Sequence, residues 1–225
     1  MFKEVEKDGK FVGLSQEYKG RHYFFGGKGL DKEDLTKLFP QYQFCFLNQV
    51  HGKVVVEGEP QETSQADAHY TDIPGRALVV QSADCLPILM GATDYVCAIH
   101  AGWKGVAQNI LAAVGMHLPR FRPAFSAIGP HISTASFEVG HDVAETLDHA
   151  APTGVRSNRF STQLPTGKYL FDLKGLARAQ LVATFGLNVE VEEIAIDTKT
   201  DRRFESFRRD GERAGRQLSF VVING

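Results

Sequence analysis

The sequence predicts an α+β fold. Segments with strand character outnumber those with helix character, and the two kinds do not alternate regularly as they would in a doubly wound parallel sheet. No internal repeat, low-complexity segment or long Pro/Gly/Ser linker divides the chain. A chain of 225 residues with 43% hydrophobic content can bury one sizeable core, so residues 1–225 are expected to form a single domain.

Eight segments are predicted to be β-strands because they are short, rich in β-branched, aromatic or apolar residues, and bounded by turn-forming residues. They are Arg21–Phe25, Gln43–Val50, Lys53–Glu57, Ala77–Val80, Tyr95–Ile99, Ala124–Ile128, Val189–Ile196 and Gln217–Ile223. The stretch Pro152–Gly167 is the least regular part of the chain and is predicted to be a long surface loop.

Four segments are predicted to be helices. The clearest is Leu173–Phe185, where Asp172 is placed to cap the first turn, apolar residues share one face, and Gly186 follows the end. The other three are a short helix capped by Asp31 and ending near Phe39, a helix over Val106–His117 after a glycine-rich turn, and a helix over His141–His149.

Composition excludes several classes of partner and compartment. The formal net charge is −2, whereas nucleic-acid and membrane-surface binders carry a basic excess on one face. No apolar run approaches the ~20 residues that span a bilayer, and the N-terminus lacks the apolar core of a secretion signal. Three cysteines are too few for a disulfide framework, so we expect a reducing cytoplasm. A monomer is expected, with a dimer as the alternative.

Three reactive residues follow predicted strands. His51, Cys85 and His100 each lie where a strand gives way to a segment containing glycine or proline, a position at which functional groups are often held. One thiolate and two imidazoles form a ligand set that suits Zn²⁺ and leaves the fourth tetrahedral position open to water or substrate. The pattern therefore indicates a catalytic metal site, although the wide spacing alone is a weak signal.

Other interpretations of these residues stay open. Cys85 could be packed in the core, as is expected of Cys45 and Cys97, because cysteine is among the most buried residue types. Cys85 and His100 could also form a nucleophile–base pair in a metal-free hydrolase, with Asp84 or another acid orienting the histidine.

Five segments occur in the order NQVHGKVVV, SADCLPILM, IHAGWKGV, IGPHISTASFEVG and SFRRDGERAGRQ. In this order they resemble the YfiH family, from about Phe24 to the C-terminus. Members of that family have been called multicopper polyphenol oxidases (laccase-like) and purine nucleoside phosphorylases with adenosine deaminase activity. The resemblance implies a layered α/β sandwich with mixed β-sheets, and it maps the family's metal ligands onto His51, Cys85 and His100.

The resemblance also implies the reactions. These are phosphorolysis of adenosine, inosine, guanosine or S-methyl-5′-thioadenosine, and hydrolytic deamination of adenosine, with purine nucleoside and phosphate as the small-molecule partners. Zinc suits the deamination because it activates water near neutral pH. Phosphorolysis also needs an anion site, for which Arg208, Arg209 and Arg216 are candidates because arginine forks bind phosphate. The alternative is a solvated turn, with the arginines paired to Asp210 and Glu212.

Further site residues are predicted on the same motifs. The expected catalytic residues are Cys85, Asp84 and Arg208, of which Asp84 could act in acid–base chemistry or as a partner to a histidine. The expected substrate-binding residues are Asn48 and Gln49, which flank His51, and Arg209, Arg216 and Trp103, the only tryptophan, which could stack on a purine.

Two departures from the family pattern bear on the metal. His69 stands in a segment that usually lacks histidine, so it is a candidate fourth ligand, and Asp197 stands where relatives usually have cysteine. None of the eight histidines forms a His-X-His pair of the kind that multicopper centres use. Zinc is therefore the expected ion. A Cu²⁺-dependent polyphenol oxidase is the runner-up, and a non-enzymatic metal-binding module is a further alternative.

Overall fold

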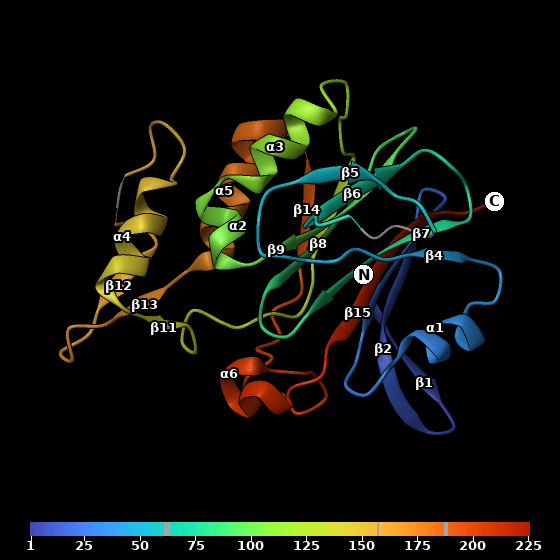
Figure 1. Cartoon of the computed structure of the whole chain (residues 1–225), viewed down its shortest axis with the longest axis horizontal. Coiled ribbons are helices and arrows are strands. Elements are labelled where there is room, and N and C mark those ends of the chain that lie inside the picture. Colours follow the sequence, from blue (N-terminus) through green and yellow to red (C-terminus); the bar gives the residue numbers. More distant parts are fainter. Residues whose placement is uncertain (61–63, 157, 187–188) are drawn as a thin grey trace.

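The computed structural model describes residues 1–60, 64–156, 158–186 and 189–225. Two six-stranded sheets form the centre of the molecule, and helices cover the outer face of each (Figure 1). The predicted layered sandwich of helices and mixed sheets is therefore confirmed. None of the helices in the described ranges combines the length and apolar character that crossing a bilayer requires.

The first sheet is mostly antiparallel, with one parallel pair at its edge between β4 and β7. Its strands, in spatial order, are β1 (Lys3–Lys7), β2 (Lys10–Tyr18), β3 (Arg21–Gly26), β15 (Gln217–Ile223), β7 (Arg76–Ser82) and β4 (Gln43–Cys45). Strands β1 and β2 were not predicted. The two-residue turn Asp8-Gly9 joins β1 to β2, and the turn Lys19-Gly20 joins β2 to β3. All four residues have positive φ, as two-residue hairpin turns require.

The second sheet is mixed, with parallel pairs at both edges. Its strands, in spatial order, are β14 (Glu190–Glu193), β10 (Phe125–Ile128), β8 (Leu86–Gly91), β9 (Val96–Ala101), β6 (Ala68–Thr71) and β5 (Val55–Glu57). Strands β8 and β6 were also not predicted. Strand β8 is buried along its whole length and carries Pro87, so it shows neither the alternation nor the composition of an ordinary strand.

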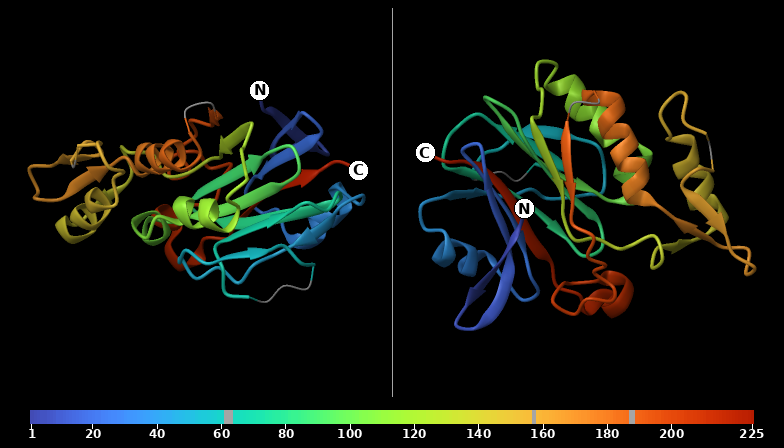
Figure 2. Two further views of the ribbon diagram at one scale, coloured as in Figure 1. Left: turned by 90° about the horizontal axis from the view of Figure 1, so that it is seen from above. Right: turned by 180° about the vertical axis from the view of Figure 1, so that it is seen from behind.

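Three apolar clusters hold the layers together. Leu78 and Val80 of the first sheet pack against Ala98 and Phe125 of the second. The outer face of the second sheet packs against α2 (Trp103–Ala107), α3 (Ile110–His117) and α5 (Leu173–Phe185). The outer face of the first sheet packs against the region of α1 (Lys32–Leu38). Figure 2 shows the resulting layers edge-on.

A small lobe extends from one end of the sandwich (Figures 1 and 2). It contains α4 (His141–His149) and a three-stranded sheet of β11 (Glu138–Val139), β13 (Tyr169–Phe171) and β12 (Ser161–Gln163). Strand β12 lies within Pro152–Gly167, so the prediction of a loop along that whole stretch was wrong; residue 157 of the stretch lies outside the described part.

The predicted starts of two helices are confirmed, and in both a capping residue directly precedes the helix. Asp31 caps α1 in a capping box with Asp34, and Asp172 caps α5 by accepting a hydrogen bond from the backbone N–H of Gly175 at 2.9 Å. The single helix predicted over Val106–His117 was wrong. Asn109 adopts the left-handed conformation (φ 58°), which ends α2 and lets its side chain cap α3.

The predicted strand Gln43–Val50 was too long, because the chain leaves the sheet after Cys45 and only an isolated bridge joins Asn48 to Gln65. The short helix α6 (Phe207–Asp210) and the 3₁₀ turn Gly211–Arg213 were not predicted. They place the segment before β15 beside the end of the sandwich.

Candidate active site

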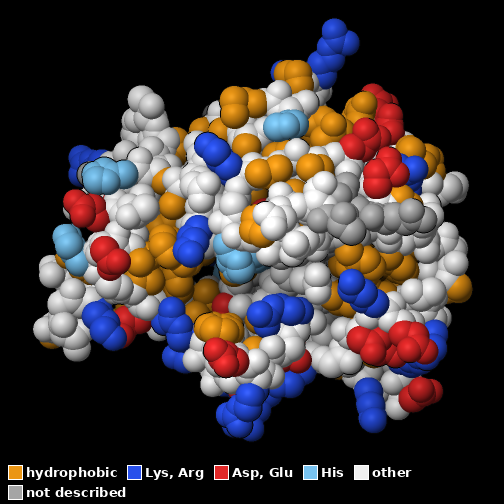
Figure 3. Space-filling view, viewed as in Figure 1, with side chains coloured by type: hydrophobic (Ala, Val, Ile, Leu, Met, Phe, Trp, Pro, Cys, Tyr) orange, Lys and Arg blue, Asp and Glu red, His pale blue; other side chains and the backbone are white. Residues whose placement is uncertain are grey.

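A cavity of about 660 Å³ opens where the lobe, α6 and the end of the sandwich meet. Its walls come from the segment after β4, the turn between β7 and β8, the end of β9, the start of α2, the start of α5 and α6. Figure 3 shows the molecule hollowed at this place, with basic side chains at the edge of the hollow. A cavity of this size accommodates a small organic molecule of nucleoside size.

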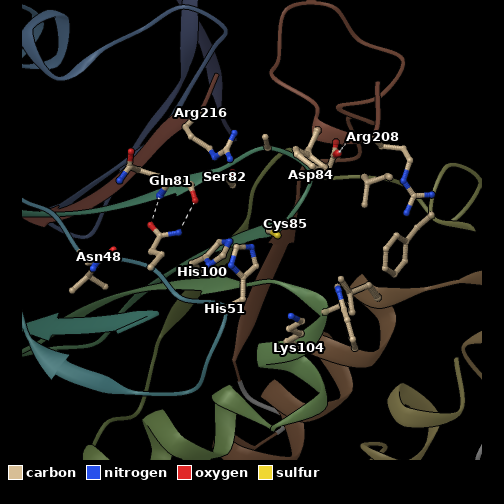
Figure 4. Close-up of a pocket in the computed structure, with 18 residues that line it drawn as sticks. Asn48, His51, Gln81, Ser82, Asp84, Cys85, His100, Lys104, Arg208 and Arg216 are labelled. Atoms are coloured by element: carbon tan, nitrogen blue, oxygen red, sulfur yellow. Dashed lines mark hydrogen bonds between the residues drawn. The ribbon is translucent and has the colours of Figure 1, made fainter. Parts of the chain in front are cut away.

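His51, Cys85 and His100 meet in the wall of this cavity and point toward one another (Figure 4). Their ligand atoms all lie within 4.8 Å of one another, and they form the one group of three or more potential metal ligands found among the described residues. His51 is exposed, Cys85 is half-buried and His100 is buried. A ligand cluster open on the His51 side leaves room for water or substrate.

The donor set fits one metal ion. A tetrahedral zinc site separates its nitrogen and sulfur ligands by about 3.3–3.6 Å, so small side-chain adjustments bring these three atoms to bonding distance. Three ligands also leave one coordination position open, which is typical of catalytic rather than structural sites.

Asp67, which was not predicted as a site residue, organises the ligands. Its Oδ1 accepts hydrogen bonds from His100 Nδ1 at 2.8 Å and from the His51 backbone N–H at 2.9 Å. Its Oδ2 accepts from the backbone N–H groups of Gly52 at 2.7 Å and Val50 at 3.2 Å. One buried carboxylate therefore fixes both the ring of His100 and the backbone that carries His51, as outer partners of metal ligands do.

The hydrogen bonds of Asp67 determine its charge. Burial raises the pKa of the Asp67 carboxyl, but the hydrogen bond from His100 and the backbone N–H groups outweigh this and hold the pKa below its usual value. The carboxylate is thus ionised and keeps the proton of His100 on Nδ1. The other ring nitrogen, Nε2, is left for Cys85 or a metal.

The thiol of Cys85 is activated by its neighbours. Burial raises the pKa of Cys85, but the positive charge of His100 and hydrogen bonds from His100 and His51 outweigh it and lower the pKa to about 6. Burial likewise lowers the pKa of His100, but Cys85 and Asp67 together raise it to about 9. Without a metal, the pair is therefore a thiolate and an imidazolium at neutral pH, and the thiolate is the form that binds metal.

Two glycines let the ligands approach one another. A Cβ on Gly102 would lie 3.0 Å from Cδ2 of His51 and 3.1 Å from Sγ of Cys85, and a Cβ on Gly105 would lie 2.8 Å from the carbonyl oxygen of Gly52. His51 itself adopts positive φ (60°). The glycines of the HAGWKG segment are thus required by the packing around the ligands, and not only by the turn into α2.

Asp84 lies in the cavity wall with both carboxylate oxygens engaged. Oδ1 accepts a hydrogen bond from Thr198 Oγ1 at 2.7 Å, and Oδ2 accepts from the Arg208 backbone N–H at 2.6 Å. The carbonyl of Asp84 accepts from the Ile132 backbone N–H at 3.0 Å. Its positive φ (86°) places Cys85 beside the histidines while its side chain holds the start of α6. This arrangement supports a positioning role for Asp84 rather than proton transfer.

The structure separates the three candidate arginines. Arg208 and Arg216 line the cavity and lie on either side of Asp84 in Figure 4, whereas Arg209 is not part of the lining. The guanidinium of Arg209 donates to the carbonyls of Thr198 (2.7 Å) and Phe204 (2.9 Å) and pairs with Asp210 at 2.8 Å. Arg209 therefore holds the turn together, and we do not retain it as a phosphate ligand.

The remaining predicted contacts also differ from one another. Gln49 lines the cavity, but its amide is bound to the backbone of Gln81, donating to the carbonyl and accepting from the N–H, both at 2.7 Å (Figure 4). Asn48 is exposed in the lining. Trp103 lines the cavity at the start of α2 and also packs against the core beneath the helices.

Neither departure from the family pattern contributes to the ligand cluster. His69 is fully buried in β6 and is not among the three clustered ligands. Asp197 accepts hydrogen bonds from the hydroxyls of Ser133 (2.9 Å) and Ser136 (2.6 Å), so it fastens the segment before β11. It lies outside the cavity lining.

Comparisons with known proteins agree with this architecture. The family model described as multi-copper polyphenol oxidoreductase laccase matches residues 33–224. Purine nucleoside phosphorylase YfiH of Escherichia coli is 36% identical over 188 residues, covering 79% of this chain and 73% of that protein. Purine nucleoside phosphorylase PA4543 of Pseudomonas aeruginosa is 36% identical over 182 residues, with the same two coverages.

Solved structures show the same fold. Protein NMB0706 of Neisseria meningitidis has a TM-score of 0.81 at 28% identity and is covered over 100% of its chain and 95% of this one. YlmD of Geobacillus stearothermophilus has a TM-score of 0.83 at 24% identity, with 98% of each chain covered. From the family match and the sequence identities, the chain belongs to the multi-copper polyphenol oxidoreductase laccase family, the family of YfiH.

Proposed function

We propose that this protein is a zinc-dependent purine nucleoside phosphorylase that also deaminates adenosine. Its substrates would be adenosine, inosine, guanosine and S-methyl-5′-thioadenosine, which phosphate converts to the free base and the corresponding sugar 1-phosphate. The observation that carries the proposal is a single cavity of about 660 Å³ that joins a His–Cys–His ligand cluster to two arginines. Relatives at 36% identity are named purine nucleoside phosphorylases, which supports this reaction.

Arg216 and Arg208 are the proposed phosphate contacts. Nη1 of Arg216 is held by the carbonyls of Ala214 and Gly215, and Nη1 of Arg208 by the carbonyl of Glu138 at 2.9 Å. These hydrogen bonds hold each guanidinium group in place and leave its other N–H donors available to an anion. In phosphorolysis a phosphate oxygen forms a bond to C1′, the bond from C1′ to the base nitrogen breaks, and the base leaves with a proton. The arginines hold the phosphate for this attack and offset its charge.

The ligand cluster would serve the hydrolytic reaction. His51, Cys85 and His100 would hold zinc, which when bound supplies Lewis acidity and activates water near neutral pH. Asp67 keeps His100 in the correct tautomer and its charge stabilises the site. Deamination adds the elements of water at C6 of adenine and releases ammonia, giving inosine.

Incubation of the purified, zinc-loaded protein with adenosine tests the proposal. With phosphate present, we expect adenine and ribose 1-phosphate in addition to the products of deamination; without phosphate, we expect inosine and ammonia only. The Cys85→Ser variant is expected to lose the deamination. Absence of turnover of all four nucleosides by the zinc-loaded protein would refute the proposed function.

The geometry also favours a second candidate for the metal-free state. Cys85, His100 and Asp67 form a thiolate–imidazole–carboxylate series, in which Asp67 and not Asp84 orients the histidine. A cysteine hydrolase would keep its hydrolytic activity after chelator treatment, whereas the zinc enzyme would lose the deamination of adenosine. Elemental analysis also tests the copper oxidase, which requires bound copper and oxygen uptake with a phenol.

A further inference from the structure

Phe207 is a large apolar side chain left exposed in the lining of the cavity. It is the first residue of α6, and its exposed fraction is 52%. Other exposed large apolar side chains of the described chain, such as Val50, Val54 and Met116, are not part of this lining. No ring of a described residue stacks on Phe207, although rings pair frequently elsewhere in the molecule. The face of its ring is thus available to a ligand.

The turn that carries Phe207 is rigidly anchored. The side chain of Ser206 caps α6, and the backbone N–H of Arg208, the residue after Phe207, donates to Asp84 Oδ2 at 2.6 Å. The Arg208 guanidinium lies over the ring of Phe137, 5.6 Å from its centroid, and Arg209 is tied to three backbone carbonyls. These contacts hold the backbone of Phe207 in place without burying its side chain, so its exposure is a property of a fixed turn and not of a frayed end.

The wall of the cavity also carries apolar side chains from the segment between β10 and β11 and from the start of α5. Ile132, Phe137 and Leu173 line it, and all three are buried. The polar and metal-ligating groups come from the segment after β4, the turn after β7 and the end of β9. A ligand that matches this lining has a flat apolar part for the aromatic side and polar groups for the ligand cluster and arginines.

From this arrangement we infer that Phe207 stacks on the purine base and sets the preference for a flat aromatic base. The inference rests on the proposed function. The electron-rich face of a phenyl ring attracts a π-system and does not attract phosphate or sugar hydroxyls, so the base is the part of a nucleoside that fits it. Phe207 is better placed for this role than Trp103, whose ring also packs against the core.

Binding can be measured without turnover, because Trp103 is the only tryptophan and lines the same cavity. The fluorescence of Trp103 is followed while adenosine is titrated into the wild type and into the variants Phe207→Ala, Phe207→Leu and Phe207→Tyr. Stacking of a base on an aromatic residue corresponds to about a fivefold or greater change in Kd. We expect Kd for adenosine to rise by that factor in the alanine and leucine variants. The tyrosine variant keeps an aromatic ring and should bind adenosine with a Kd near that of the wild type.

Met116→Ala serves as the matched control, because Met116 is 74% exposed on α3 and outside this cavity. It is expected to leave the Kd for adenosine unchanged. In phosphorolysis, Phe207→Ala should raise KM for adenosine and leave KM for phosphate unchanged. Wild-type adenosine affinity in Phe207→Ala, or equal recovery by leucine and tyrosine, would overturn the inference.

The two proposals fail in different ways. If the wild type binds adenosine through Phe207 but does not convert it, the proposed function is wrong and the stacking inference holds. If the wild type converts adenosine and Phe207→Ala binds it equally well, the function holds and the inference is wrong.

Discussion

Asp67 Oδ1 lies 2.8 Å from His100 Nδ1, and the same carboxylate accepts hydrogen bonds from the backbone N–H groups of the segment that carries His51. One residue therefore sets the geometry of two of the three proposed metal ligands. Asp67 and His100 are both buried, so solvent screens the charge of Asp67 only weakly at the histidine ring.

Asp67→Asn is expected to weaken zinc binding about 10- to 100-fold, because the amide removes the charge opposite His100 and one acceptor of the loop. Competition with a chromophoric chelator measures the affinity. Asp94→Asn is the matched control, since Asp94 is exposed beside β9 and distant from the ligands in the fold. Equal zinc affinity in Asp67→Asn and wild type would show that Asp67 only supports the loop.

Alkylation of the metal-free protein should be selective for Cys85. Since its pKa is lowered to about 6, the reactive thiolate forms as pH rises through 6, and His100 keeps its paired charge until about pH 9. Burial raises the pKa of Cys45 to about 11 and also raises that of Cys97, so these stay unreactive. Iodoacetamide labelling followed by peptide mass spectrometry measures each rate.

Zinc should protect Cys85 from alkylation, and His100→Gln should move the midpoint of labelling upward because the imidazolium is lost. A midpoint near the usual value for a free thiol in the unsubstituted protein would contradict the thiolate assignment.

Gly102→Ala is expected to weaken zinc binding at least tenfold, because the added Cβ would crowd His51 and Cys85 at 3.0 and 3.1 Å. Gly102 has a φ of −71°, which alanine also adopts readily, so the substitution does not strain the backbone. Gly52→Ala is the control: it also adjoins a ligand, but its Cβ would lie at ordinary contact distance, 3.5 Å or more from its neighbours. Equal loss of zinc in both variants would contradict crowding as the cause.

Arg216→Gln is expected to raise KM for phosphate about 10- to 150-fold, the range for losing a hydrogen bond to a charged group. The melting temperature should not change, because Arg216 is exposed and its hydrogen bonds within the described ranges go to the carbonyls of its own turn, those of Ala214 and Gly215. Arg213→Gln, on the same turn but outside the lining, is the control. An unchanged KM for phosphate in Arg216→Gln would exclude the residue from the anion site.

Arg209→Ala is expected to act on stability, in contrast to Arg216→Gln. It leaves the carbonyls of Thr198, Lys199 and Phe204 without their donor, at a cost of about 1–3 kcal/mol and hence a melting temperature lower by about 3–10 °C. Arg202→Ala, at an exposed position nearby, should not shift it. Unchanged melting together with an impaired KM for phosphate would restore Arg209 to the anion site.

The sequence predicted those parts of the fold whose signals are local. Asp31 and Asp172 lie directly before the helices they cap, and the capping signal predicted both starts. Asn109 also caps a helix and belongs to the residue types that favour a cap and the left-handed conformation, but it lies inside a helix-compatible run and was not recognised as a boundary. Strand β8 was missed because burial on both faces removes the alternation by which a strand is recognised, and Pro87 argued against it.

The site residues were likewise predicted only in part. The residue types of His51, Cys85 and His100 were sufficient to propose a ligand set, since zinc chemistry restricts the donors. Asp67 acts through backbone N–H groups that are distant in sequence, and it directly precedes β6, a strand that was itself not predicted. The three arginines look equivalent in sequence, and only their hydrogen bonds separate Arg209 from Arg216.

Strand β15 follows every other strand along the chain, yet it lies in the interior of the first sheet, where Ser219 pairs with both Phe25 and Val80. During synthesis, β3 and β7 emerge from the ribosome long before the strand that must lie between them. The nascent chain thus exposes two unsatisfied strand edges, which are sites for chaperone binding or aggregation. Arg208 and Arg216 are made just before β15, so the cavity is completed only when this last strand inserts.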